Sequence, residues 1–266
     1  MQKRWENLNL MKKRFNEYIK LIVVKHVIFS LIAALTAMVE VRDSLPAPYV
    51  IIWLLIGGIG AIVGGNAISK VSDMGIENRD LVKHNGELSK GIINKQEGLI
   101  FAAMGFSIII LSGQMISNLA LIFSPVAIVL LIVNAYSERF TWACHFILGI
   151  VSSSAPIAVS IAITGGISKI VIFIGIANFL WVSASDIIYS IKKYDFNIKN
   201  GIYSIPTSFG VGISIKIALL LYFMAIIMII YIGEISSKLG IIYYLCVIGI
   251  IIKYYRDYRS IIVNKR

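Results

Sequence analysis

The sequence predicts an all-α membrane protein, a bundle of about eight transmembrane helices. Hydrophobic residues make up 58% of the 266 positions and charged residues only 15%, whereas a soluble domain is typically about 45–50% apolar. Eight apolar runs are each long enough to cross a bilayer, which takes roughly 20 residues. They lie near residues 21–39, 48–69, 97–115, 117–136, 142–164, 168–190, 210–233 and 238–256.

The distribution of Lys and Arg predicts which helix ends face the cytoplasm. The N-terminus and the segments after every second helix carry 22 of the 25 basic residues, and basic segments stay on the cytoplasmic side. We therefore expect a multi-pass protein of the cytoplasmic membrane with both termini inside. The net charge of +11 then reflects topology and a surface facing anionic lipid, and it requires no nucleic-acid partner. The predicted cytoplasmic segments are 1–25, 70–96, 137–141, 191–216 and 253–266.

The whole chain, 1–266, is predicted to form one integral membrane domain. Residues 1–20 form a polar cytoplasmic segment that is too long and too charged to begin a signal peptide, and 257–266 form a cytoplasmic tail. The long cytoplasmic loops, 70–96 and 191–209, follow the second and sixth helices. This spacing indicates two four-helix units in chain order.

Small residues and cysteines inside the helices are interpreted as packing residues. The two cysteines have no CxxC spacing and no histidine at metal-site spacing. The second helix is crowded with glycines, which allow close helix approach in membranes. The residues concerned are Cys144, Cys246, Gly57, Gly58, Gly60, Gly64 and Gly65.

Charged residues gather where the second predicted helix leaves the membrane. Lys70, Asp73 and Glu77 are spaced i, i+3 and i+7, so a helical extension would place them on one face. We call these three residues the first polar station. Charge at membrane depth is costly and usually marks a functional site. The alternative is a set of interfacial charges with snorkelling lysines.

The end of the sixth predicted helix carries a similar set, the second polar station. Its residues Asp186, Tyr189 and Lys193 share one helix face. If the second and sixth helices are neighbours, the two faces converge on a polar cavity open to the cytoplasm. Converging carboxylates suit Mg²⁺, which typically joins one or two carboxylates to a substrate phosphate.

Several segments match patterns of a known family, in order and at consistent spacing. Residues 139–149, followed by Pro156, resemble K-R-F-T-x-x-x-H-x-x-L-G, and residues 201–210 resemble G-x-x-S-I-P with a following F-G. Residues 25–31 resemble E-H-T-x-F-x-L, and 85–91 occupy the place of N-R-P-L-x-S-G. From about residue 16 to 255, the chain thus resembles the UbiA superfamily of intramembrane prenyltransferases, closest to its 4-hydroxybenzoate polyprenyltransferase branch.

The resemblance implies a reaction and its partners. Such enzymes transfer a polyprenyl group from its diphosphate to an aromatic acceptor, with Mg²⁺ held by two Asp-rich motifs. The implied partners are a polyprenyl diphosphate, the lipid bilayer and an acceptor that is either 4-hydroxybenzoate-like or a menaquinone-pathway precursor. The pattern carries no signal for an oligomeric state. The family usually has nine transmembrane helices, so we expect a UbiA-like bundle that lacks the ninth.

Both Asp-rich motifs depart from the family pattern. The first, N-D-x-x-D-x-x-x-D, aligns with Ser69, Lys70, Asp73 and Glu77. The second, an Asp ahead of D-x-x-x-D, aligns with Asp186, Lys193 and Asn197, with Asp195 beside them. We expect Lys70 and Lys193 to contact the diphosphate as point charges, so that the role of Mg²⁺ is reduced or partly replaced.

The expected site residues fall into four groups by role. The catalytic residues are Asp73, Asp186, Arg139 and Tyr189. The residues that contact the diphosphate are Lys70, Lys193, Lys199, Asn66 and Ser69. The residues of the acceptor pocket are His26, Thr141, His145 and Asn85. The ligands of Mg²⁺ are Asp73, Glu77, Asp186 and Asp195.

Two other functions fit the sequence. A divergent, inactive relative would keep the fold and bind isoprenoid lipid or a partner protein. A small-molecule transporter would also have many helices and one-sided loops, but no charge lies near a bilayer midplane. We expect prenyl transfer rather than either alternative.

Overall fold

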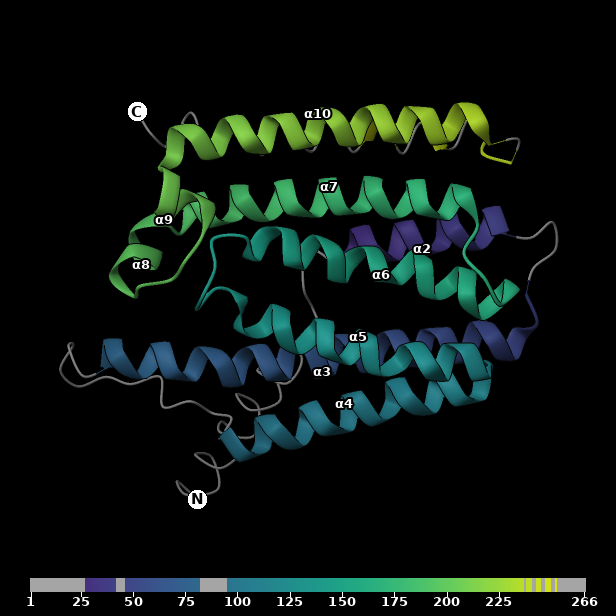
Figure 1. The fold of residues 1–266 in the computed structure, drawn as a ribbon, viewed down its shortest axis with the longest axis horizontal. Coiled ribbons are helices and arrows are strands. Elements are labelled where there is room, and N and C mark those ends of the chain that lie inside the picture. The colour runs from purple at the N-terminus through teal and green to yellow at the C-terminus, as the bar shows by residue number, and fades with distance from the viewer. Residues whose placement is uncertain are drawn as a thin grey trace, which may run out of the picture. The chain divides into compact units, whose positions relative to one another are not determined.

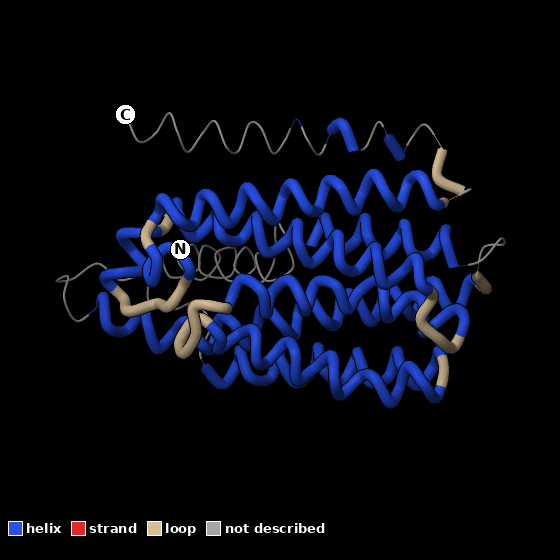
Figure 2. The backbone as a smooth tube through the Cα atoms, turned by 45° about the horizontal axis from the view of Figure 1, so that its top comes forward, coloured by secondary structure: helices blue, strands red, loops and turns tan. Residues whose placement is uncertain are grey.

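The structure is a computed structural model that describes residues 27–41, 46–81, 95–236, 238–240, 243–244, 247–249 and 252. Side chains are described for these residues except 27–28 and 73–81. Every regular element in this part of the chain is a helix (Figure 2). The predicted all-α class is therefore confirmed.

Within the described residues, six helices are long and apolar enough to cross a membrane, and they coincide with six of the predicted spans. The predicted first span overlaps a shorter apolar helix, α2 (Val27–Val41). The predicted eighth span lies largely outside the described residues, as do the segments 1–20 and 257–266. The six helices are α3 (Pro48–Leu81), α4 (Lys95–Ile116), α5 (Asn118–Ser137), α6 (Cys144–Thr164), α7 (Lys169–Lys192) and α10 (Val211–Ile235).

The helices group into two compact units. One contains α3, α4 and α5, and the other contains α2 and the helices from α6 onward. The predicted grouping in chain order is therefore wrong for α2, which joins the C-terminal unit. Phe29 of α2 lies 5.3 Å, between ring centroids, from Trp181 of α7. The single-domain organisation stays a prediction.

Close contact between backbones holds α3 against α4. A Cβ atom on Gly105 would lie 2.5 Å from the backbone nitrogen of Gly64, and one on Gly60 would lie 2.8 Å from the carbonyl oxygen of Gly105. Only glycine permits this approach, which confirms the packing role of Gly60 and Gly64. Gly58 differs, because a Cβ there would meet nothing within 4 Å.

Helix α7 is the centre of the second unit. It lies between α6 and α10 (Figure 1), and its side chains are the most deeply buried of the six spans. Ala184 and Ile187 of α7 are fully buried, as is Ala218 of α10. Trp181 packs edge-on against Tyr222 with 4.7 Å between ring centroids. Tight van der Waals packing of this kind, rather than exclusion of water, joins helices in a membrane.

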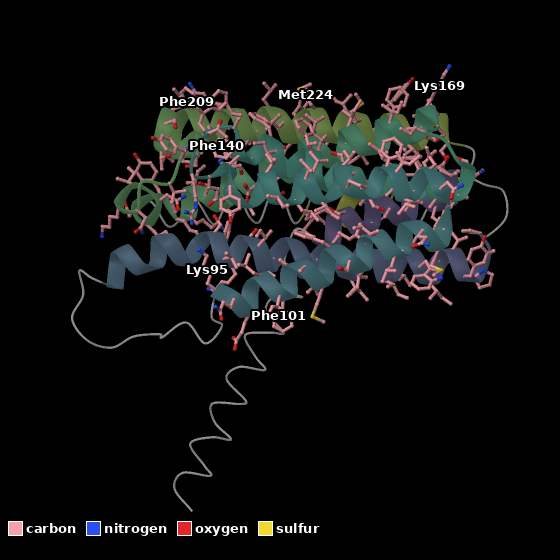
Figure 3. All side chains as sticks on the ribbon, turned by 60° about the horizontal axis from the view of Figure 1, so that its bottom comes forward. Lys95, Phe101, Phe140, Lys169, Phe209 and Met224 are labelled. Carbon is pink, nitrogen blue, oxygen red and sulfur yellow. The ribbon has the colours of Figure 1, made fainter. Side chains whose placement is uncertain are left out.

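Two short helices follow α7 at one end of this unit, α8 (Tyr194–Lys199) and α9 (Ile205–Phe209). They occupy most of the segment 191–209, which is predicted above to be a loop. Figure 3 shows Phe140 and Phe209 toward this end and Lys169 at the opposite end. Segments predicted to be cytoplasmic thus share one end of the unit, away from a lysine predicted to lie outside.

Candidate functional site

A buried histidine and a carboxylate form the centre of the candidate site in the second unit. His145 lies in the first turn of α6 and Asp186 lies near the end of α7. His145 Nδ1 and Asp186 Oδ2 are 2.7 Å apart, and the two side chains are only 2% and 14% exposed. Two predicted site residues, 41 positions apart in the chain, are thus brought into direct contact.

The second nitrogen of the same ring faces the start of α9. The backbone N–H of Ile205 donates to His145 Nε2 across 3.3 Å. The first backbone N–H groups of a helix have no hydrogen-bond partner within the helix. At the start of α9, each residue either donates to a side chain outside the helix or has no N–H group. Pro206 has no N–H, and the N–H of Thr207 donates to the hydroxyl of Ser204. Other groups of the protein therefore accept the hydrogen bonds from the start of α9.

The segment that leads into α9 is fastened to the start of α6. The N–H of Tyr203 donates to the carbonyl of Glu138 across 2.8 Å, and the Cys144 thiol donates to the carbonyl of Tyr203. Gly201 has a φ of +65°, a conformation that favours glycine. The segment 201–206 therefore has a defined path beside the histidine. Cys144 is buried, as its interpretation as a packing residue requires.

Two predicted residues meet on the exposed face at the end of α7. The ammonium of Lys193 lies 4.5 Å from the centroid of the Tyr189 ring, and both side chains are exposed. The geometry is that of a cation–π contact. Asn197, one turn further on, is instead buried, and its amide donates to the Ser190 hydroxyl across 3.0 Å. Position 197 is therefore held in the protein interior.

The remaining predicted residues of this unit lie around the same end. Arg139, Asp195 and Lys199 are exposed. Thr141 is half-buried, and its hydroxyl accepts a hydrogen bond from the N–H of Ala143 across 3.1 Å. These residues come from the connection between α5 and α6 and from α8.

The first polar station belongs to the other unit. Helix α3 runs unbroken to Leu81, so Lys70, Asp73 and Glu77 lie on one helix at the spacing that places them on one face. Asn66, Ser69 and Lys70 of α3 are half-buried. The side chains of Asp73 and Glu77 lie outside the described residues, as do His26 and Asn85.

The described side chains form no group of three or more His, Cys, Asp or Glu residues that could hold a metal ion. Two of the four expected ligands, Asp186 and Asp195, lie among these side chains and belong to no such group. By donor type the expected set suits Mg²⁺, which prefers carboxylate oxygens and needs only one or two of them when a phosphate completes its shell.

Comparison with known proteins identifies the family. A sequence model described as the UbiA prenyltransferase family matches residues 30–262. The chain belongs to this family. The match includes α3, with the first polar station, and the whole of the segment from α6 to α10.

Several proteins are similar in sequence to part of this chain. The chain is 27% identical over 176 residues to a 4-hydroxybenzoate octaprenyltransferase of Aliivibrio fischeri, an alignment that covers 66% of this chain and 61% of that protein. A protein of the same name from Nitrosomonas eutropha is 29% identical over 170 residues, which cover 63% of this chain and 59% of the relative. The chain thus spans only about three fifths of the length of these relatives.

Among solved structures, the apo structure of a UbiA homolog from Aeropyrum pernix K1 has a TM-score of 0.72 and 25% identity and covers 85% of this chain and 84% of its own. A UbiA homolog from Archaeoglobus fulgidus, bound to GPP and Mg²⁺, has a TM-score of 0.70 and 19% identity. The match covers 94% of this chain and 87% of the homolog. This likeness places the chain in the UbiA fold.

Three contacts of the candidate site were not predicted from the sequence. The first joins His145 and Asp186, which the sequence assigned to different roles. The partner of His145 at Ile205 was missed because it is a backbone group, which carries no residue-specific signal. For the contact between Asn197 and Ser190, the sequence offers only a weak signal. The two residues are seven positions apart, one on each side of the end of a helix. For His145, the structure shows both ring nitrogens facing protein partners, and its role toward an acceptor stays a prediction.

Proposed function

We propose that this UbiA-family protein transfers a prenyl group from an allylic diphosphate to an aromatic acceptor within the membrane. The observation that carries the proposal is the family match over residues 30–262, which spans both polar stations. The proteins named 4-hydroxybenzoate octaprenyltransferase support an aromatic acid as acceptor. The Archaeoglobus homolog bound to GPP and Mg²⁺ supports an allylic diphosphate as donor.

The acidic residues near each station are the proposed holders of Mg²⁺, namely Asp73 and Glu77 on α3, and Asp186 and Asp195 in the second unit. When bound, the metal would offset the charge that develops on the departing diphosphate. Of these carboxylates, Asp186 is contacted by the buried His145.

Lys193 is the proposed cationic contact of the diphosphate in the second unit. Its cation–π contact with Tyr189 is exposed and therefore worth about 0.5–1 kcal/mol. A hydrogen bond from an ammonium to a charged phosphate oxygen contributes about 1.5–3 kcal/mol. Because the hydrogen bond to phosphate is the stronger interaction, we expect the ammonium to move from the ring to a bound diphosphate. Lys70 on α3 is proposed to act in the same way.

The function is tested by product analysis. Purified full-length protein in lipid nanodiscs is incubated with allylic diphosphates of different length and a panel of aromatic acids, with Mg²⁺ present. We expect a prenylated acid in the mass spectrum for at least one pair. A protein that binds these diphosphates and turns over none of them would contradict the proposal.

The role of Lys193 is tested by removing its charge. We expect Lys193→Met to raise the KM for the diphosphate about ten-fold or more, because a charge-assisted hydrogen bond is lost. The neighbouring Lys192, which is also exposed, provides the matched control, and Lys192→Met should change KM by less than about two-fold. Equal effects of the two changes would show only a general loss of positive charge.

Chelation of Mg²⁺ tests whether the lysines take over part of the role of the metal. If Lys70 and Lys193 partly replace Mg²⁺, the wild-type enzyme retains measurable prenyl transfer in excess EDTA. Complete loss of activity on chelation would rule out a metal-sparing role, although prenyl transfer itself would stand.

One observation favours a second function. Position 197 has a buried asparagine bonded to Ser190, where the motif has a carboxylate. A family member that binds isoprenoid diphosphate or lipid without turnover is therefore the alternative. Saturable binding of an allylic diphosphate without any product would support it.

A further inference from the structure

The hydrogen-bond partners of His145 determine which nitrogen carries its proton. A backbone N–H can only donate, so His145 Nε2 must offer a lone pair to Ile205. The ring proton is then on Nδ1, which faces the Asp186 carboxylate at 2.7 Å. A doubly protonated ring would set two donors against each other in a buried site, which is unfavourable.

We propose that His145 is a positioning residue, a neutral imidazole that holds the Asp186 carboxylate in place by donating from Nδ1. The inference rests on the proposed function, in which Asp186 is a carboxylate of the active site. It assigns to His145 an action through Asp186 rather than contact with the acceptor.

The surroundings of the ring explain why it can act in this way. His145 is 2% exposed and is fixed by the first turn of α6. On its far side Ile205 starts α9, which Ser204 caps through reciprocal hydrogen bonds with Thr207. The ring therefore joins the end of α7 to the starts of α6 and α9. A ring with a hydrogen-bond partner at each nitrogen is held in one orientation, and it orients in turn the carboxylate that it contacts.

The path of the chain into α9 reinforces the same connection. The hydrogen bonds from Tyr203 to Glu138 and from Cys144 to Tyr203 tie the segment before α9 to the residues that precede His145. The Ile205 N–H that donates to His145 Nε2 thus belongs to a segment that is itself held by hydrogen bonds. This geometry distinguishes His145 from a histidine that merely fills space between helices.

Two substitutions separate hydrogen bonding from volume. Gln offers one acceptor for Ile205 and one donor for Asp186, the same pair as the neutral ring, whereas Leu fills similar space and offers neither. We expect His145→Gln to keep at least about ten times the kcat/KM of His145→Leu, and we expect His145→Leu to need more Mg²⁺ for half-maximal rate. Equal activity of the two variants would overturn the proposal.

A double substitution tests whether the pair acts as a unit. If His145 acts only through Asp186, adding His145→Leu to Asp186→Asn lowers kcat/KM no further, because residues that work together are not additive. A further loss of ten-fold or more (about 1.4 kcal/mol) in the double variant would show an independent role and overturn the proposal.

The tautomer is measured without any activity assay. Full-length protein with ¹⁵N-labelled histidine is examined by NMR in lipid, and the resonances of His145 are identified as those missing in His145→Gln. We expect a neutral ring protonated at Nδ1. Protonation at Nε2, or at both nitrogens, would contradict the proposal. Because this measurement needs no substrate, it stays valid if the protein transfers no prenyl group, so failure of the proposed function and failure of this inference are distinguishable.

Discussion

Asn197 has a structural role at a position that aligns with the second Asp-rich motif. The side chain is buried, and its amide donates to Ser190. Its backbone carbonyl accepts the N–H of Ile202, at the start of the segment that leads to α9. A carboxylate here would have no proton to donate and would bring a charge into the interior. An uncharged residue is therefore favoured over an acidic one at this position.

Asn197→Asp is accordingly expected to destabilise the protein, even though it restores the family motif. Loss of the donor and burial of the charge should cost about 2 kcal/mol or more, which lowers the apparent Tm by several degrees. The opposite isosteric change, Asp195→Asn at an exposed position of α8, should leave Tm nearly unchanged. Thermal unfolding in detergent measures both. An unchanged Tm for Asn197→Asp would show that this position tolerates a carboxylate.

At the scale of elements, the contact between α3 and α4 depends on glycine. Gly105→Ala would place a methyl group 2.5 Å from the backbone of Gly64, so the helices must separate. We expect a loss of about 1–3 kcal/mol and a lower apparent Tm in thermal unfolding.

Gly58→Ala on α3 is the matched control, because its methyl group meets nothing within 4 Å and alanine favours the helix by about 0.5–1 kcal/mol. Its Tm should be unchanged or higher than wild type. Equal destabilisation by the two changes would mean that the backbones are not in close contact at Gly105.

At the scale of the whole molecule, the distribution of charge leads to a prediction about orientation. In a chain whose native cysteines are replaced by serine, Lys238→Cys should react with a membrane-impermeant thiol reagent added to intact cells, because it is exposed and predicted to lie outside. Asn264→Cys should react only after the cells are opened. Labelling of Asn264→Cys from outside would refute the predicted cytoplasmic C-terminus.

The spans that cross the membrane were predictable, and the short helices near the site were not. Six spans agree with the predicted runs because length and hydropathy alone decide which segments can cross a bilayer. Helices α8 and α9 have only six and five residues, too few to form by propensity. Helix α9 is stabilised by the cap and contacts of Ser204, Thr207 and His145, which only the folded chain provides.

The sequence by itself determined that this is a helical membrane protein, which helix ends carry charge, and which residues align with the motifs of the UbiA family. These properties follow from local composition and spacing. The tertiary structure alone decided that α2 packs with the C-terminal unit, that His145 contacts both Asp186 and Ile205, and that Asn197 is buried. Each of these depends on how helices distant in the chain pack together, and the local sequence does not specify that packing.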